Sequence, residues 1–202
     1  MTNKISILVA LWLVFAFSDY FYIPYFVQPF SWLLVCITLL ILLVKQIIKV
    51  IKERKNLKTK RLLNLSIALF LFFLTIYKVN KIPHSIIEKI DWTISYNKRL
   101  QIVKEVFTRK LKPNTEMNNG ICKLPFDFPI ISNGGNDIWI YENKTDRTKT
   151  IKFWISRGFF DSPQTYFIFT NDNEIKKQYE KQIKTEPEYN WKLEENWYRI
   201  MD

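Results

Sequence analysis

Three long apolar runs occupy the first 80 residues of the chain. Few polar side chains interrupt them, and each run is apolar on every helical face, unlike the one-sided stripe of a helix in a soluble core. A helix needs about 20 mostly apolar residues to cross a bilayer, and isolated runs of this kind can span it only as helices. The pattern predicts a transmembrane anchor at 1–80, with spans at about 5–24, 28–49 and 61–80.

The first run has an alternative interpretation. Lys4, the mostly apolar segment from Ile5 to Phe15 and then Ala16-Phe17-Ser18 resemble a signal peptide with a small-x-small cleavage site. The aromatic stretch that follows, Tyr20 to Phe26, is typical of the membrane interface and favours an uncleaved helix. The sequence leaves open whether residues 1–18 are removed.

The distribution of charge predicts an orientation. The chain carries a formal net charge of +11, and residues 1–80 hold ten basic and two acidic side chains. Under the positive-inside bias, the basic loop 45–61 stays in the cytoplasm, the N-terminus lies inside and residues 81–202 lie outside. Anionic headgroups are the nearest partners of this loop. The predicted headgroup-binding residues are Lys45, Lys49, Lys52, Arg54, Lys55, Lys58, Lys60 and Arg61.

Residues 81–202 have the length of one small extramembrane domain. After a short linker at Pro83 and His84, the pattern predicts a helix from Ile86 to Leu111, ended by Pro113. Its apolar stripe is Tyr96, Leu100, Val103, Phe107 and Leu111, and its solvated basic face is Lys98, Arg99, Lys104, Arg109, Lys110 and Lys112.

Short alternating segments with turn residues between them follow. They predict strands at 121–124, 137–142, 150–157 and 166–170, a short surface helix at 174–183, and a last strand or strand-helix mixture at 191–200. Asn133-Gly134-Gly135 predicts a tight turn, because glycine adopts positive φ without a steric cost. The fold class predicted is α+β, with a small antiparallel sheet and one long helix packed on it.

The C-terminal part resembles a pattern found in small uncharacterised bacterial membrane-anchored or exported proteins. The shared segments are Lys123-Leu124-Pro125, Ser132-Asn133-Gly134-Gly135, Arg157-Gly158-Phe159-Phe160-Asp161 and Leu193-Glu194-Glu195-Asn196-Trp197-Tyr198. The resemblance covers about residues 97–200. It implies a bacterial source and a single domain, and no activity.

Two groups of residues are candidates for binding. Tryptophan, tyrosine and arginine are preferred anchors at protein interfaces. The candidate partner-binding residues are Trp139, Trp154, Arg157, Asp161, Trp197 and Tyr198, with Arg157 and Asp161 expected to form an ion pair. The backbone amides of Asn133, Gly134 and Gly135 are a candidate anion nest, although a plain hairpin turn explains them as well.

The sequence holds no recognisable catalytic set. His84 is the only histidine and lacks partners at metal-ligand spacing, so no metal site is predicted. Cys36 lies in a predicted span and Cys122 in the domain, so the two are not expected to pair. Phosphate-binding, nucleophile-elbow and zinc-protease motifs are missing from the sequence, and no cofactor is predicted.

The function predicted is an integral protein of the bacterial cytoplasmic membrane with an exported partner-binding domain, in its most specific form an immunity-type protein against a toxin. One alternative is a membrane effector whose C-terminal domain senses a ligand in the cytoplasm. An enzyme of unknown type is a third hypothesis. Nucleic acid is not an expected partner, because most excess charge lies between the spans and residues 81–202 carry only +3. The oligomeric state stays open.

Overall fold

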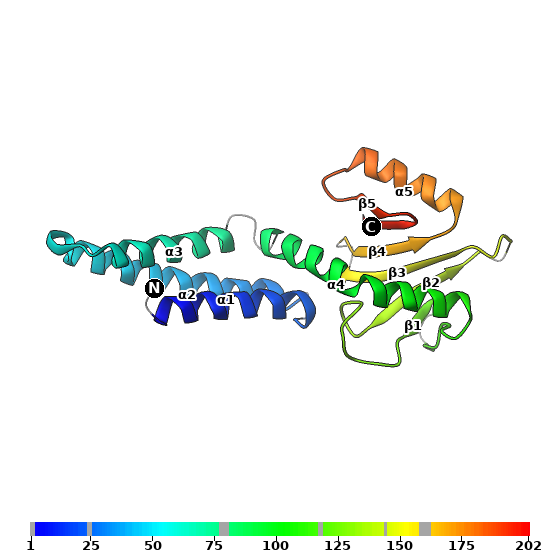
Figure 1. The fold of residues 1–202 in the computed structure, drawn as a ribbon, viewed down its shortest axis with the longest axis horizontal. Helices are drawn as coiled ribbons and strands as arrows, with labels where there is room; N and C mark the ends of the chain where they lie inside the picture. The colour runs from blue at the N-terminus through cyan, green and yellow to red at the C-terminus, as the bar shows by residue number, and fades with distance from the viewer. Residues whose placement is uncertain (1–2, 24–25, 77–80, 117–118, 144, 158–162) are drawn as a thin grey trace. The chain divides into compact units, whose positions relative to one another are not determined.

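The structure, a computed structural model, describes residues 3–23, 26–76, 81–116, 119–143, 145–157 and 163–202. The chain divides into two compact units, residues 1–89 and 90–202. The fold is α+β, with five α-helices and a six-stranded antiparallel open sheet in the described parts (Figure 1). Each unit is described by itself below.

The first unit is built from long apolar helices. Helix α1 covers Asn3–Phe21, α2 covers Gln28–Lys52 and α3 covers Thr59–Ile76, with a short 3-10 turn at Arg54–Asn56. By length and composition, α2 and α3 could each cross a membrane, whereas the apolar part of α1 is shorter. The described structure therefore contains two helices of spanning type and not clearly the three predicted.

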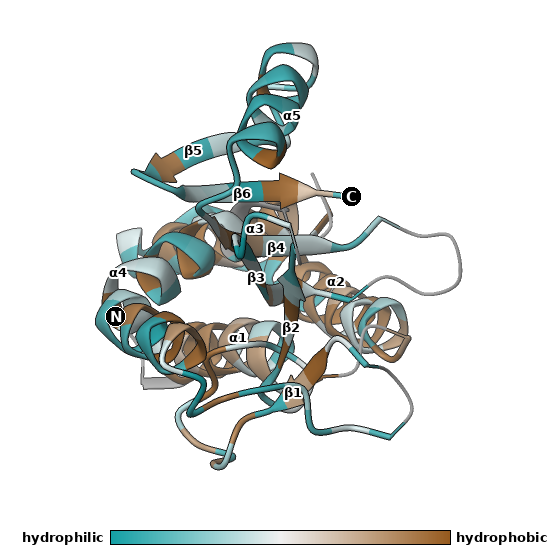
Figure 2. Cartoon of the chain, turned by 90° about the vertical axis from the view of Figure 1, so that its right-hand side faces the viewer, coloured by the Kyte–Doolittle hydropathy of each residue, from teal (hydrophilic) through white to brown (hydrophobic). Residues whose placement is uncertain are grey.

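The apolar side chains of this unit point outward as well as inward. Trp32, Leu39 and Leu43 are the buried residues of α2, whereas Leu34 on the same helix is 69% exposed and Phe70 on α3 is 60% exposed. Figure 2 accordingly colours α1, α2 and α3 largely as hydrophobic. Their outer surface is thus as apolar as their packing surface.

Helix α4 covers Lys81–Phe107, so its limits differ from the prediction at both ends. Pro83 and His84 lie inside its first turn and do not form a linker. Proline is tolerated there because its missing N–H would have no helical partner. The helix ends before Pro113 because Arg109 adopts φ 60°. Lys110 N–H then donates to Glu105 C=O at 2.9 Å, and Arg109 N–H to Val106 C=O, as in a Schellman cap.

The sheet of the second unit confirms the predicted antiparallel class and adds one hairpin. Its strands are β1 Ile121–Lys123, β2 Asp137–Glu142, β3 Lys149–Ser156, β4 Thr165–Thr170, β5 Trp191–Glu194 and β6 Trp197–Met201. Their order in the sheet is β1-β2-β3-β4-β6-β5. The segment predicted as a strand or strand-helix mixture is therefore a two-stranded hairpin. It turns at Asn196, which adopts φ 64°.

Helices cover both faces of the sheet, whereas only one packed helix was predicted. On one face, Trp92 of α4 lies 5.1 Å from Phe167 and 5.2 Å from Trp197 between ring centroids. On the other face, Tyr179 of α5 (Asn173–Thr185) lies 5.6 Å from Tyr198. The sheet is thus the middle layer between the later part of α4 and α5.

Candidate functional site

The loop between β1 and β2 is the most strongly organised irregular segment of the second unit. Asn136 lies at its end, is 1% exposed and adopts φ 56°. Its amide oxygen accepts from the N–H groups of Ile131 at 2.7 Å and Ser132 at 3.2 Å. Its amide nitrogen donates to the carbonyls of Phe126 at 3.1 Å and Pro129 at 2.9 Å. One buried side chain thereby fixes the loop at four points.

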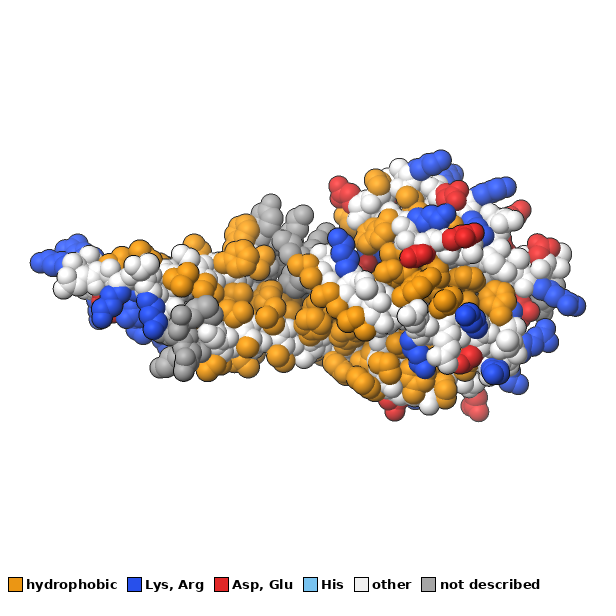
Figure 3. Space-filling view, in the orientation of Figure 1, with side chains coloured by type: hydrophobic (Ala, Val, Ile, Leu, Met, Phe, Trp, Pro, Cys, Tyr) orange, Lys and Arg blue, Asp and Glu red, His pale blue; other side chains and the backbone are white. Residues whose placement is uncertain are grey.

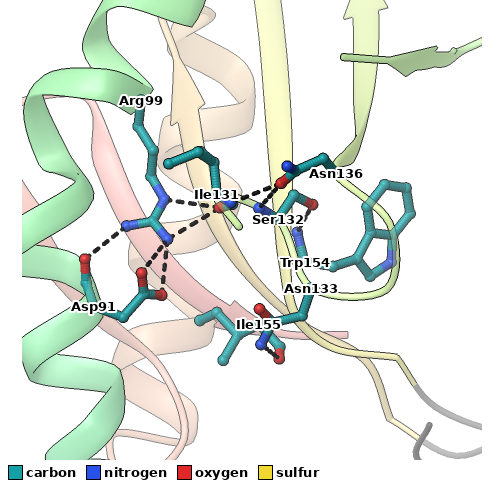
Figure 4. Close-up of polar contacts among 8 residues, drawn as sticks. All are labelled: Asp91, Arg99, Ile131, Ser132, Asn133, Asn136, Trp154 and Ile155. Carbon is teal, nitrogen blue, oxygen red and sulfur yellow. Dashed lines mark hydrogen bonds and ion pairs between the residues drawn. The ribbon is translucent and has the colours of Figure 1, made fainter. Parts of the chain in front are cut away.

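A buried ion pair holds the same loop from α4 (Figure 4). Arg99 is 1% exposed, and its guanidinium donates to both carboxylate oxygens of Asp91, at 2.9 and 2.8 Å. It also donates to the Ile131 carbonyl, at 3.0 and 3.2 Å. Its guanidinium carbon lies 4.5 Å from the centroid of the Phe167 ring. Arg99 was predicted on the solvated face of the helix, and that prediction is wrong.

The loop is joined to the neighbouring strands by further hydrogen bonds of Ser132 and Asn133, two of the residues drawn in Figure 4. The hydroxyl of Ser132 accepts from Trp154 N–H of β3 at 2.9 Å and donates to the Asp137 carbonyl of β2. Asn133 N–H donates to the Trp154 carbonyl at 2.8 Å, and the Asn133 amide donates to the Ile155 carbonyl at 2.7 Å. The loop is therefore fastened to the sheet as well as to α4.

The predicted turn at Asn133-Gly134-Gly135 is present, with φ 86° at Gly134 and 114° at Gly135. Its inner side is occupied by Arg157, because a Cβ on Gly134 would lie 2.5 Å from Arg157 Nε. Since the Asn133 N–H is bonded to β3, an anion nest would rest on the amides of the two glycines. The nest stays a prediction.

Arg157 contacts the turn and two neighbouring strands. It donates to the Asn133 carbonyl at 3.1 Å, pairs with Asp137 at 3.2 Å and stacks over Trp154 with its guanidinium carbon 4.3 Å from the ring centroid. Asp161, its predicted partner, lies outside the described residues. The described ion pair of Arg157 is therefore with Asp137.

Three of the candidate interface aromatics belong to the core. Trp154 is 5% exposed, and Trp197 and Tyr198 are each 1% exposed, so they stabilise the sheet and are not presented to a partner. Trp139 is half-buried and packs against this core. Of the predicted partner-binding residues that the structure describes, Trp139 and Arg157 retain partly accessible side chains.

The loop between β1 and β2 carries exposed apolar side chains that the sequence analysis did not identify as candidates. Phe128 is 77% exposed, and Pro125 and Pro129 are also exposed. Phe126 is half-buried and lies under Lys98, whose ammonium is 4.9 Å from the ring centroid. Their signal in the sequence is the run Pro125-Phe126-Asp127-Phe128-Pro129, in which two aromatics sit between two prolines.

The predicted headgroup-binding residues lie around the turn between α2 and α3. Lys45, Lys49 and Lys52 are in the last turns of α2, Arg54 and Lys55 form the 3-10 turn with Asn56, and Lys60 and Arg61 begin α3. In Figure 3, Lys and Arg side chains gather at this end of the two helices, at the left of the view.

The first unit also contains a buried acid. Asp19 is 0% exposed, and its Oδ2 accepts from the Trp32 indole at 2.9 Å and lies 2.7 Å from Nε2 of His84. The hydrogen bonds tie α1 to α2 and to the first turn of α4. Within the described residues, no group of three or more His, Cys, Asp or Glu side chains is placed to hold a metal ion. Cys36 and Cys122 are both free.

No protein family, no curated protein and no solved structure matches the chain.

Proposed function

We propose that the chain is a membrane-anchored protein whose second unit binds a protein partner through the loop 125–130. In its most specific form, the partner is a proteinaceous toxin and the chain an immunity-type protein of the bacterial cytoplasmic membrane. The proposed anchor has three spans, α1, α2 and α3, with the N-terminus inside and residues 81–202 outside.

The outward apolar surface of the first unit supports anchoring. Exposed leucine, isoleucine and phenylalanine side chains cover α2 and α3, including Phe30 at 72%, Leu34 at 69% and Phe70 at 60% exposure. In water, such a surface would leave a large apolar area hydrated at about 25 cal/mol per Å². A bilayer removes this cost, and the length of α2 and α3 matches its hydrocarbon core.

The observation that supports partner binding is the exposure of Phe128 on a loop whose backbone is held by buried side chains. A flexible exposed phenylalanine would lose conformational entropy on binding, and a side chain on a preorganised loop loses less. This loop is held by hydrogen bonds from three buried side chains, those of Asn136, Arg99 and Ser132. Their arrangement holds the backbone on both sides of Phe128, at Phe126 and at Pro129.

The test is site-specific photo-crosslinking of the full-length protein in bacterial cells. A photoreactive phenylalanine replaces Phe128 in one strain and Tyr141 in another; Tyr141 is 54% exposed on β2 and serves as a matched control. We expect a discrete adduct from position 128 and none from position 141. Equal adduct patterns from the two positions would contradict the proposal.

Two variants separate contact from preorganisation. Phe128→Ala removes the anchor, and loss of a central aromatic typically weakens an interface about thirtyfold or more. Asn136→Gly keeps a residue that tolerates positive φ but removes the four hydrogen bonds to the loop. We expect it to weaken binding while Phe128 is intact. Unchanged binding by Asn136→Gly would show that the clamp has no part in recognition.

Orientation is tested by reporter fusions after residue 202. Alkaline phosphatase is active only outside the cytoplasm, so an active fusion is the expected result. An inactive phosphatase together with an active cytoplasmic reporter would contradict the proposed topology and favour the cytoplasmic sensor.

A further inference from the structure

The turn between α2 and α3 has a rigid frame. Glu53 ends α2, and its N–H donates to the Lys49 carbonyl at 3.0 Å. Its carboxylate accepts two hydrogen bonds from Arg61 of α3, from Nε at 3.0 Å and from Nη2 at 2.6 Å. These bonds from Arg61 hold the pKa of Glu53 below its ordinary value. The carboxylate therefore clamps the two helices together as an anion.

A hollow of about 490 Å³ lies at this turn. This volume is within the range of small-molecule sites, about 300–1,000 Å³. Five cationic side chains and one carboxylate line the hollow, together with one amide; these residues are Lys52, Glu53, Arg54, Lys55, Asn56, Lys58 and Arg61. Because the Glu53 carboxylate is paired with Arg61, the lining holds no further carboxylate to offset the other four positive charges. A hollow of net charge +4 fits a phosphate group.

The surroundings of the hollow indicate where that phosphate comes from. Ile48 and Ile51 at the end of α2 are 46% and 61% exposed, and Leu62 and Leu63 at the start of α3 are 45% and 47% exposed. An apolar collar thus adjoins the cationic hollow directly. A soluble phosphate needs no such collar, whereas a phospholipid places acyl chains beside its phosphate.

We infer that this hollow is a binding site for the phosphate of an anionic phospholipid, with the acyl chains lying along the exposed apolar faces of α2 and α3. The site rests on the proposed membrane anchoring and is independent of partner binding by the loop 125–130. It differs from a general attraction between lysines and a membrane, because the Glu53–Arg61 pair joins the two helices at the turn whose backbone carries the cations.

Native mass spectrometry of the full-length protein in a neutral detergent tests this site. The protein is titrated with phosphatidylglycerol, which is anionic, or with phosphatidylcholine, which is zwitterionic. We expect bound phosphatidylglycerol at lower lipid concentrations than phosphatidylcholine. In the variant Arg54→Gln/Lys55→Gln/Lys58→Gln, the concentration for half-occupancy by phosphatidylglycerol should rise on the order of a hundredfold, from about fivefold per cation at a membrane surface.

The matched control removes three charges elsewhere. Lys177, Lys181 and Lys184 are exposed on α5, and Lys177→Gln/Lys181→Gln/Lys184→Gln changes the net charge by the same amount. We expect this variant to bind phosphatidylglycerol like the wild type. Equal losses in the two triple variants, or no loss in the α2–α3 variant, would overturn the site.

Two further arms separate the possible failures. Glycerol 3-phosphate that binds as tightly as the lipid would show a soluble ligand and overturn the lipid assignment. Alkaline carbonate extraction of protein reconstituted in vesicles tests the anchor itself. If the protein resists extraction but binds the two lipids equally well, the membrane anchor is supported and the lipid site is contradicted. If the protein is extracted, both the anchor and the lipid site are contradicted.

Discussion

Replacing Arg99 with methionine tests whether the buried ion pair organises the second unit. Methionine has a similar length and fills part of the same space, but it cannot donate hydrogen bonds. The change removes the guanidinium that lies between Asp91, the Ile131 carbonyl and the Phe167 ring. It leaves a carboxylate in an interior where Asp91 is only 5% exposed.

The expected cost follows from burial. Breaking a buried pair by removing one partner typically costs about 3–5 kcal/mol, because the other charge stays buried and loses its opposite charge. The total stability of a domain is about 5–15 kcal/mol, so this is a large share. Replacing both partners by apolar residues removes that buried charge as well. For Asp91→Leu/Arg99→Met we therefore expect a loss of stability of only about 1–3 kcal/mol, because the Ile131 carbonyl loses its hydrogen-bond donor.

Hydrogen exchange of the full-length protein in detergent provides the measurement. The slowest amides of β3 and β4 report the opening free energy of the whole sheet. Since each 1.4 kcal/mol is a factor of ten, Arg99→Met should lower their protection about a hundredfold or more. The double variant should recover part of that loss. A single variant that matches the wild type, or a double variant at least as unstable as the single, would refute the reasoning.

Four other substitutions give three independent predictions. Gly134→Ala should lower the thermal midpoint more than Gly135→Ala, because a Cβ on Gly134 meets Arg157 at 2.5 Å whereas one on Gly135 meets no atom within 4 Å; equal shifts would show that only the positive φ matters. Asp172→Ala should cost about 1 kcal/mol at pH 7, since Asp172 caps α5 by accepting from two backbone N–H groups. A hydrogen bond from Thr148 lowers the pKa of Asp172 in the folded protein. The stabilisation that the Asp172 carboxylate provides is therefore present above its unfolded pKa of about 3.9 and is lost as pH falls below that value. Urea titrations should accordingly show a smaller stability difference between Asp172→Ala and wild type at pH 3 than at pH 7. Burial raises the pKa of Tyr179, so the stability that depends on its neutral phenol is present below the unfolded value of about 10 and is lost as pH rises above it. Tyr179→Phe should flatten the alkaline decline of stability between pH 9 and 11, and an unchanged slope would contradict this assignment.

Local sequence patterns predicted the helices and strands whose apolar residues repeat with one clear helical or strand period. The strands Asp137–Glu142 and Thr165–Thr170 were found within one residue, because alternation and turn residues mark a strand locally. The cover of both sheet faces was missed because α5 is mostly polar, and only Tyr179 and its neighbours pack inward. Its sequence was interpreted as a short surface helix that does not cover a face of the sheet.

The site was harder to predict because its residues act through tertiary contacts. Asp91 and Arg99 are eight residues apart, farther than the three- or four-residue spacing of ordinary helical ion pairs. Arginine on a basic helix face is usually solvated, whereas Arg99 is buried by tertiary contacts with the returning loop at Ile131 and with the Phe167 ring. Asn136 carried one local signal, since asparagine adopts positive φ more often than most other non-glycine residues. The four bonds that it makes depend on where the loop lies.

The place of β6 in the sheet determines when the second unit can form during synthesis. β6 pairs with β4, and Trp197 supplies a ring that contacts Trp92, Phe153 and Phe169. Until β6 pairs with it, β4 is an open sheet edge that carries Phe167, Ile168 and Phe169. An unpaired apolar edge of this kind invites pairing with other chains. The second unit is therefore most prone to pairing with other chains before β6 and Trp197 are in place.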